Sequence, residues 1–160
     1  MNPLRTLQPK GWKQPRGYSN GIAAQGRMVF VGGQVGWDEN EVFQSDDFVE
    51  QVRQTLKNTV AILAEGGASP EHIVRMTWYV TDKQEYLRSL KGVGAAYREI
   101  IGRHFPVMAM VQVVALIEDR AKVEIESTAM VPRHPDESDP QDVGNAARGQ
   151  DVHSGRGPVP

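Results

Sequence analysis

Residues 46–67, DDFVEQVRQTLKNTVAILAEGG, carry a helical pattern that requires an apolar layer to pack against. The apolar side chains recur at three- and four-residue spacing and fall on one helical face; they are Phe48, Val52, Leu56, Val60 and Leu63. Carboxylates at the start of the segment and a glycine pair at its end are typical of a helix N-terminus and C-terminus. The segment therefore predicts one long amphipathic helix.

Four other segments are typical of strands and could supply that layer. RMVFVGG (27–33) is an apolar run that ends at two glycines, and IVRMTWYVTD (73–82) alternates apolar with polar side chains. FPVMAMVQVVAL (105–116) is almost continuously apolar, and AKVEIESTAMV (121–131) alternates again. Because the short turn EDR joins the last two runs, we expect them to pair as a hairpin.

A second helix is predicted from Asp82, with Glu85 three residues later in the position of a capping box. Counting one further strand before the first helix, the order is then strand, strand, helix, strand, helix, strand, strand. It predicts an α+β domain with two helices on one face of a mixed sheet. Such a sheet leaves its other face uncovered, and Val111 and Val113 belong to that face. We therefore expect the chain to associate with copies of itself.

The composition limits the classes of function. A length of 160 residues fits one domain that can bury a core without metal or disulfides. The sequence has no cysteine, which excludes thiol chemistry and suits the cytoplasm. A net charge of −2 with scattered Lys and Arg argues against nucleic acid, and no segment is long and apolar enough for a membrane. Residues 1–15 are expected to be an N-terminal extension, and residues 133–160 a disordered tail.

GYSNG (17–21) matches the G-x-S-x-G pattern of a serine-hydrolase nucleophile elbow. That elbow needs a strand before the serine and a helix after it. Here a polar, proline-broken stretch precedes the motif, and GIAAQG followed by a strand comes after it. Ser19 is therefore not expected to be a nucleophile.

Two glutamates are candidates for catalysis. Glu124 and Glu126 lie two residues apart on a predicted strand, so their side chains leave the same face roughly 7 Å apart. This separation resembles that of the paired carboxylates of inverting glycosidases. The alternative, that both are solvated or salt-bridged, is favoured by the ordinary exposure of Glu.

Other polar and sulfur side chains give weaker signals. The four histidines share no metal-binding spacing, so no metal is expected. His104 either lines a pocket beside Phe105-Pro106 or lies exposed at a helix end. Met108 and Met110, at strand spacing, are more typical of a core than of a cofactor contact. Arg75 is expected to form an ion pair.

Taken in order, the segments resemble the Rid (reactive intermediate deaminase) superfamily. The resemblance is carried by PRGYSNG, RMVFVGGQVGWD, QVRQTLKNTVAILAEGG, IVRMTWYVTD, AYREIIGRHFPVMAMVQV and KVEIESTAMV. It implies a Rid-like domain over residues 16–132 with a chorismate-mutase-like, two-layer fold. It also implies a homotrimer that binds a small molecule in clefts between subunits, without a cofactor. The tail has no counterpart in the family.

The resemblance is weaker at the family's site. In the deaminating members, an arginine on the strand after the Phe-Pro pair holds the carboxylate of a 2-imino or 2-enamino acid while water attacks the imine carbon. Met108 stands at that position. Gly32, Gly94 and Gln112 stand where the family has a serine, an asparagine and often a glutamate.

Two polar residues of the family's site are retained. The resemblance implies that Tyr18 borders the cleft and that Glu124 orients the attacking water. Since a thioether donates no hydrogen bond to a carboxylate, the pocket suits a neutral, more apolar ligand. Met110, His104 and Arg103 complete the predicted substrate-binding set.

Three functions are compatible with these residues. The leading hypothesis is hydrolysis or tautomerisation of an imine, enamine or related reactive substrate other than the small 2-imino acids, with Glu124 as general base. The second is a trimer that binds a small metabolite in the same clefts without turnover. The third is a deaminase in which Arg103 replaces the missing cation.

Overall fold

The computed structural model describes residues 4–133, which contain six strands, three α-helices and one 3-10 helix. In chain order they are β1 (Leu4–Leu7), β2 (Gly21–Ala24), β3 (Arg27–Val35), α1 (Phe48–Glu65), the 3-10 helix (Pro70–His72), β4 (Ile73–Val80), α2 (Lys83–Arg88), α3 (Leu90–Ile100), β5 (Val107–Gln112) and β6 (Val123–Val131).

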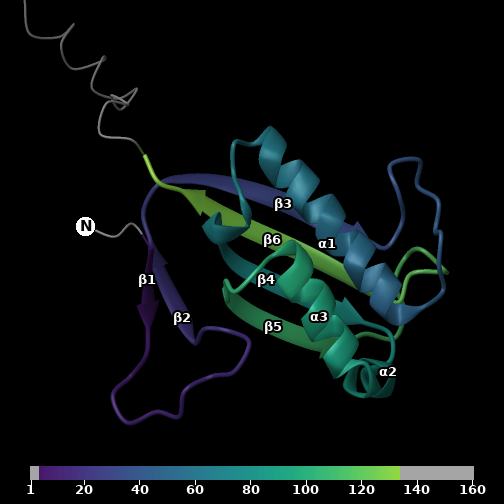
Figure 1. Cartoon of the computed structure of the whole chain (residues 1–160), viewed down its shortest axis with the longest axis horizontal. Helices are drawn as coiled ribbons and strands as arrows, with labels where there is room; N and C mark the ends of the chain where they lie inside the picture. The colour runs from purple at the N-terminus through teal and green to yellow at the C-terminus, as the bar shows by residue number, and fades with distance from the viewer. Residues whose placement is uncertain (1–3, 134–160) are drawn as a thin grey trace, which may run out of the picture.

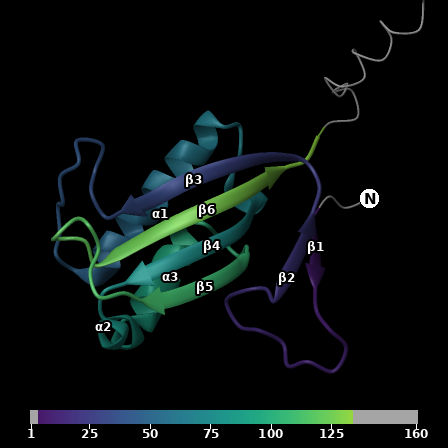
Figure 2. The ribbon, with the colours of Figure 1, turned by 180° about the vertical axis from the view of Figure 1, so that it is seen from behind.

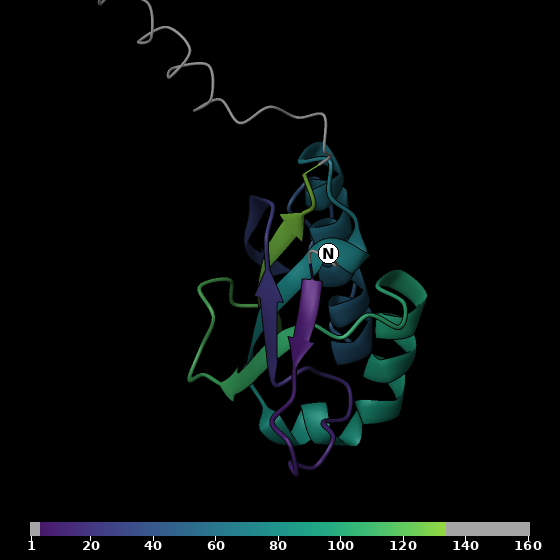
Figure 3. The same ribbon diagram turned by 90° about the vertical axis from the view of Figure 1, so that its left-hand side faces the viewer.

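Four strands form a mixed sheet in the order β3-β6-β4-β5. β6 is antiparallel to both of its neighbours, and β5 is parallel to β4. All the α-helices lie on one face of this sheet (Figure 1), and the opposite face carries none (Figure 2). The edge-on view shows the two layers side by side (Figure 3). The predicted α+β class, with a mixed sheet covered on one face, is confirmed.

The predicted hairpin between the last two strands is wrong. β5 pairs in parallel with β4, and α2 and α3 form the crossover that a parallel pair requires. β6 instead lies between β3 and β4 and is hydrogen-bonded along both edges. The turn signal between the two runs is local, whereas β6 gains its two neighbours from segments far away in the sequence.

The long helix forms as predicted. Asp47 caps α1 by accepting a hydrogen bond of 2.9 Å from the Glu50 backbone N–H, and Gly66 ends the helix. Four of the five predicted apolar side chains are buried, and Val60 packs half-buried against the same core. They cover the β6 and β3 side of the sheet.

The second helix is divided at Ser89 into α2 and α3. Asp82 caps α2 by accepting from the backbone N–H groups of Gln84 and Glu85. The Glu85 carboxylate does not complete the predicted capping box. It accepts a hydrogen bond of 2.7 Å from the side-chain amine of Lys122, the residue directly before β6. The predicted single helix is therefore two helices that share one cap region.

One buried amide joins three segments. The Gln51 side chain on α1 is 1% exposed and donates to the carbonyls of Ser45 and Arg120. Its oxygen accepts a hydrogen bond of 2.9 Å from the Lys122 backbone N–H. The loop before α1 and the start of β6 are thereby fixed to the helix.

The structure near both ends of the chain can be compared with the predicted domain boundaries, residues 1–15 and 133–160. β1 falls within the predicted extension of residues 1–15 and pairs with β2 in a separate two-stranded sheet. The predicted tail lies outside the described residues apart from Arg133. None of the helices in residues 4–133 is long and apolar enough to cross a membrane.

Glu41 provides a test of the loop between β3 and α1. Its φ of 60° lies in the left-handed region, which glycine adopts freely but which is unfavourable for a residue with a side chain such as Glu. We expect Glu41→Gly to raise the free energy of unfolding by about 0.5–1 kcal/mol, measured by urea denaturation. Asn40→Gly is the control, because Asn40 has no positive φ and glycine there only adds freedom to the unfolded chain. Stabilisation by both changes, or by neither, would contradict the assignment of strain to Glu41.

Candidate functional site

Glu124 lies half-buried on the uncovered face of the sheet, opposite Tyr79 of β4. On its other side β3 shifts register between Val31 and Gln34, and Gly33 lies in that irregularity. A Cβ built on Gly33 would overlap the carboxylate of Glu124. The Glu124 carboxylate therefore fills the space that the missing side chain of Gly33 leaves.

Tyr18 lies beside the start of β5. The next residue, Ser19, donates its backbone N–H to Pro106 O at 2.9 Å and its hydroxyl to Phe105 O at 2.6 Å. Ser19 also forms a parallel bridge with Val107. The motif leads into β2 and no helix, so the prediction that GYSNG is not a nucleophile elbow is confirmed. Tyr18 itself is 43% exposed, which leaves its ring available to a neighbour.

Met108 and Met110 face the helix layer. In the parallel register they lie beside Met76 and Trp78, which are 0% and 2% exposed, and both methionines pack half-buried against the same core. Glu124 is on the other face, since it pairs with Tyr79. Within one subunit, the structure therefore does not bring Met108 and Glu124 together.

His104 and Tyr97 hold the end of α3 to the sheet. The ring Nε2 of His104 lies 2.6 Å from Ile73 O, and the His104 carbonyl accepts a hydrogen bond of 2.8 Å from the Tyr97 hydroxyl. The Tyr97 ring stacks on Phe105 at 6.2 Å between centroids, and burial raises the pKa of Tyr97 above its usual value. These contacts give His104 a structural role inside the subunit.

The remaining predicted residues are spread around the β5 edge. The Gln112 side chain accepts a hydrogen bond of 2.8 Å from the Lys83 N–H and so caps α2. Gly94 lies on α3, where a Cβ would approach the guanidinium of Arg98 at 3.3 Å. Arg103 is exposed and makes no hydrogen bond or ion pair with the described residues.

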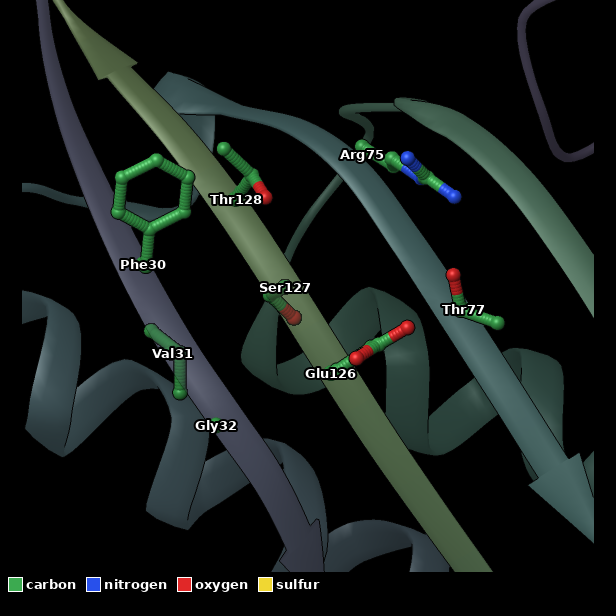
Figure 4. A pocket seen from close by; sticks show the side chains of 8 residues that line it. All are labelled: Phe30, Val31, Gly32, Arg75, Thr77, Glu126, Ser127 and Thr128. Atoms are coloured by element: carbon green, nitrogen blue, oxygen red, sulfur yellow. The ribbon is translucent and has the colours of Figure 1, made fainter.

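A pocket of about 310 Å³ lies on the uncovered face (Figure 4). The residues around it come from β3, β4 and β6 and include Phe30, Gly32, Arg75, Thr77, Glu126 and Thr128. Of the residues predicted from the family resemblance, only Gly32 lines it, together with Glu126 of the candidate glutamate pair. Alternation placed Arg75, Thr77 and Glu126 on polar faces, but it did not show that β4 and β6 are neighbours.

The polar groups of this pocket are incompletely paired. Arg75 forms no ion pair with residues 4–133, so the partner expected for it is not found within one subunit. The Thr77 hydroxyl is buried without a hydrogen-bond partner. Glu126 accepts a hydrogen bond of 2.9 Å from the Tyr79 hydroxyl, and this bond raises the pKa of Tyr79. The residues around the pocket thus include one cation, one carboxylate and two buried hydroxyls without a partner, those of Thr77 and Ser127.

The chain is similar in sequence and in fold to known proteins. Residues 12–131 match the family model described as Endoribonuclease L-PSP. Protein DfrA of Myxococcus xanthus is 34% identical over 120 residues, which cover 71% of this chain and 84% of that protein. A 2-iminobutanoate/2-iminopropanoate deaminase of Salmonella typhimurium is 32% identical over 108 residues, which cover 66% of this chain and 80% of that protein. The solved Yersinia pestis protein YyfB, of the conserved Rid protein family, superimposes with a TM-score of 0.72 at 26% identity and covers 81% of this chain and 99% of its own.

The fit between Gly33 and Glu124 can be tested by stability. Gly33→Ala should lower the melting temperature by several degrees, because the new methyl group displaces the carboxylate or the bulge. Gly32→Ala is the matched control, since nothing lies within 4 Å of a Cβ at that position. Differential scanning fluorimetry of both variants gives the comparison, and equal melting temperatures would mean that Glu124 does not depend on Gly33.

Proposed function

Because the chain belongs to the Rid family, described also as Endoribonuclease L-PSP, we propose that it hydrolyses an imine or enamine. The observation that carries the proposal is Glu124, a half-buried carboxylate held against Gly33 on the open face. A carboxylate in such a place can take a proton from water as the water oxygen attacks the imine carbon. The proton passes to nitrogen, the carbinolamine collapses to a carbonyl, and ammonia leaves.

The substrate is proposed to differ from the small 2-imino acids. Met108 offers no hydrogen-bond donor where the family places an arginine, and Met110 adds a second apolar side chain on the same face. Losing a charge-assisted contact to a carboxylate costs about 1.5–3 kcal/mol, or one to two decades in affinity. A neutral, more apolar imine or enamine fits this surface better.

A small-molecule substrate is preferred over RNA, although the family model is described as an endoribonuclease. The net charge of −2 provides no attraction for a phosphate backbone. Zero cysteines suit the cytoplasm, where we place the protein. Tyr18, exposed beside the start of β5, is assigned to the edge of the same cleft.

The site is proposed to form between subunits of a homotrimer. Met108 and Glu124 lie on opposite faces of one sheet, so a cleft that uses both needs Glu124 from one copy and Met108 from another. The uncovered face also exposes large apolar side chains, namely Met28 at 51%, Phe30 at 69% and Val111 at 47%. Covering these side chains supplies the driving force for assembly.

Light scattering at low micromolar concentration tests the assembly. We expect a mass close to three times the 17.7 kDa of the chain. A folded monomer would contradict both the trimer and the shared cleft, because Glu124 and Met108 would then never meet.

Met108→Arg tests the substrate assignment. We expect the wild-type protein to give little acceleration of 2-iminopropanoate or 2-iminobutanoate hydrolysis, and Met108→Arg to restore part of it by holding the carboxylate. Met110→Arg is the matched control, because it adds the same charge two residues further along the same face. The assay traps with semicarbazide the imine that an amino-acid oxidase generates.

Two alternatives make different predictions in this assay. If Arg103 replaces the missing cation, the wild-type protein turns over these imines and Arg103→Ala abolishes the activity. If the chain is a non-catalytic binding trimer, the wild type and every variant are inactive. Robust wild-type turnover that survives Arg103→Ala would contradict the substrate assignment, since catalysis would need neither cation.

A further inference from the structure

We propose that an acidic segment, residues 136–142, docks on a basic loop, residues 8–16, of the same chain. The basic loop QPKGWKQPR lies between β1 and β2 and carries three cations, Lys10, Lys13 and Arg16. The acidic segment DESDPQD follows the end of β6 and lies outside the described residues. The match to the family model ends at residue 131, so this contact belongs to this chain and not to the family. It is independent of the proposed hydrolysis, because it uses none of the residues assigned to the cleft.

The cations of the basic loop have no acidic partner in the structure. All three are exposed, and none makes a hydrogen bond or an ion pair with residues 4–133. Their neighbours in the sequence offer no counter-charge either, because the first acidic residue of the chain is Asp38. Arg5, on β1 of the same hairpin, adds a fourth exposed cation. The hairpin is therefore a region of positive charge that attracts a negatively charged segment.

The acidic segment has the complementary charge. Its acidic residues are Asp136, Glu137, Asp139 and Asp142, and the next cation along the chain is Arg148. Residues 133–160 contain few apolar side chains, so attraction between charges is the contact available to them. One exposed ion pair contributes little, whereas several charges in a network contribute more. Because the segment is tethered to the loop, its effective concentration there is on the order of millimolar, and a weak attraction suffices.

The acidic segment starts within reach of the basic loop. β6 ends at Val131, which pairs with Arg27 just after β2, and a Cβ built on Gly26 would overlap the Val131 carbonyl. The β1–β2 hairpin extends away from this point (Figures 1 and 2), and its paired part places the loop about 13 Å further on. An extended chain spans about 3.4 Å per residue, so residues 136–142 can lie from about 17 to about 37 Å beyond Val131. That range includes the distance to the basic loop.

The proposed trimer does not require the basic loop. The hairpin is a separate two-stranded sheet, whereas the copies would cover the open face of the four-stranded sheet. Charged side chains are depleted in the core of protein interfaces. A loop with three cations and no acidic residue is therefore a poor contact between copies, but a good contact for an acidic segment.

A nitroxide spin label in the acidic segment tests the contact. The sequence has no cysteine, so Ser138→Cys gives a single labelling site between Glu137 and Asp139. In the full-length protein at roughly 20 mM salt, where charges are weakly screened, we expect the backbone amide NMR signals of residues 8–16 to lose at least about half of their intensity. Ser154→Cys is the matched control, because it carries the same label further along the chain and outside the acidic segment.

Two sets of substitutions in the labelled protein separate the basic loop from positive charge in general. The test set replaces the cations of the basic loop: Lys10→Gln, Lys13→Gln and Arg16→Gln. The control set replaces three exposed cations of the helix layer: Lys57→Gln, Lys91→Gln and Arg98→Gln. The test set should restore the lost intensity and the control set should leave the loss unchanged, with circular dichroism as the check that each protein is folded.

Salt provides a test without substitutions in the loop. About 0.5 M NaCl should restore the signals, because it screens charges beyond a few ångströms. The proposal would be overturned by no loss at residues 8–16, by equal loss from the labels at positions 138 and 154, or by a loss that persists in the test set or at high salt. Equal loss around Lys57 and Lys91 would also overturn it, because the segment would then approach any cation.

Discussion

The alternation of side chains along β4 and β6 determines which face of the sheet carries Glu124, Glu126 and Arg75. Successive residues of a strand point to opposite faces, and here one face packs on helices while the other carries none. On β4, Met76 and Trp78 enter the core, so Arg75 and Thr77 must emerge on the open face. The same rule places Met108 and Glu124 on opposite faces of the sheet, although only β4 lies between their strands, β5 and β6.

Much of the fold could be predicted because it depends on local patterns. The apolar stripe of α1, the carboxylates at its start, the helix start at Asp82 and the strand character of β3 to β6 are all readable within a few residues. Strand order is not local, which is why the hairpin between β5 and β6 was predicted and does not form. The break at Ser89 was also missed, since Tyr86 and Leu90 continue the helical spacing across it.

The candidate sites likewise combine features that local patterns predict with features that depend on strand order. Sequence spacing correctly put Glu124 and Glu126 on one face. Their neighbours differ, however: Glu124 lies against Gly33, whereas Glu126 accepts a hydrogen bond from Tyr79 at the pocket. Neither partner could be read from the sequence, because each comes from an adjacent strand whose register depends on the whole sheet. The pocket is assembled within a single subunit, whereas the cleft that we propose for Glu124 and Met108 needs a second copy of the chain.

The buried side chain of Gln51 makes the domain sensitive to a change of a single functional group. Its nitrogen donates to two carbonyls and its oxygen accepts one N–H, so both ends of the amide are in use. Hydrolysis of that amide to a carboxylate would keep the shape and remove both donors, leaving a buried negative charge facing two carbonyl oxygens. Chemical ageing at this one position would loosen the loop before α1 and the start of β6 together. The durability of the domain therefore depends on water being kept away from Gln51, which is 1% exposed.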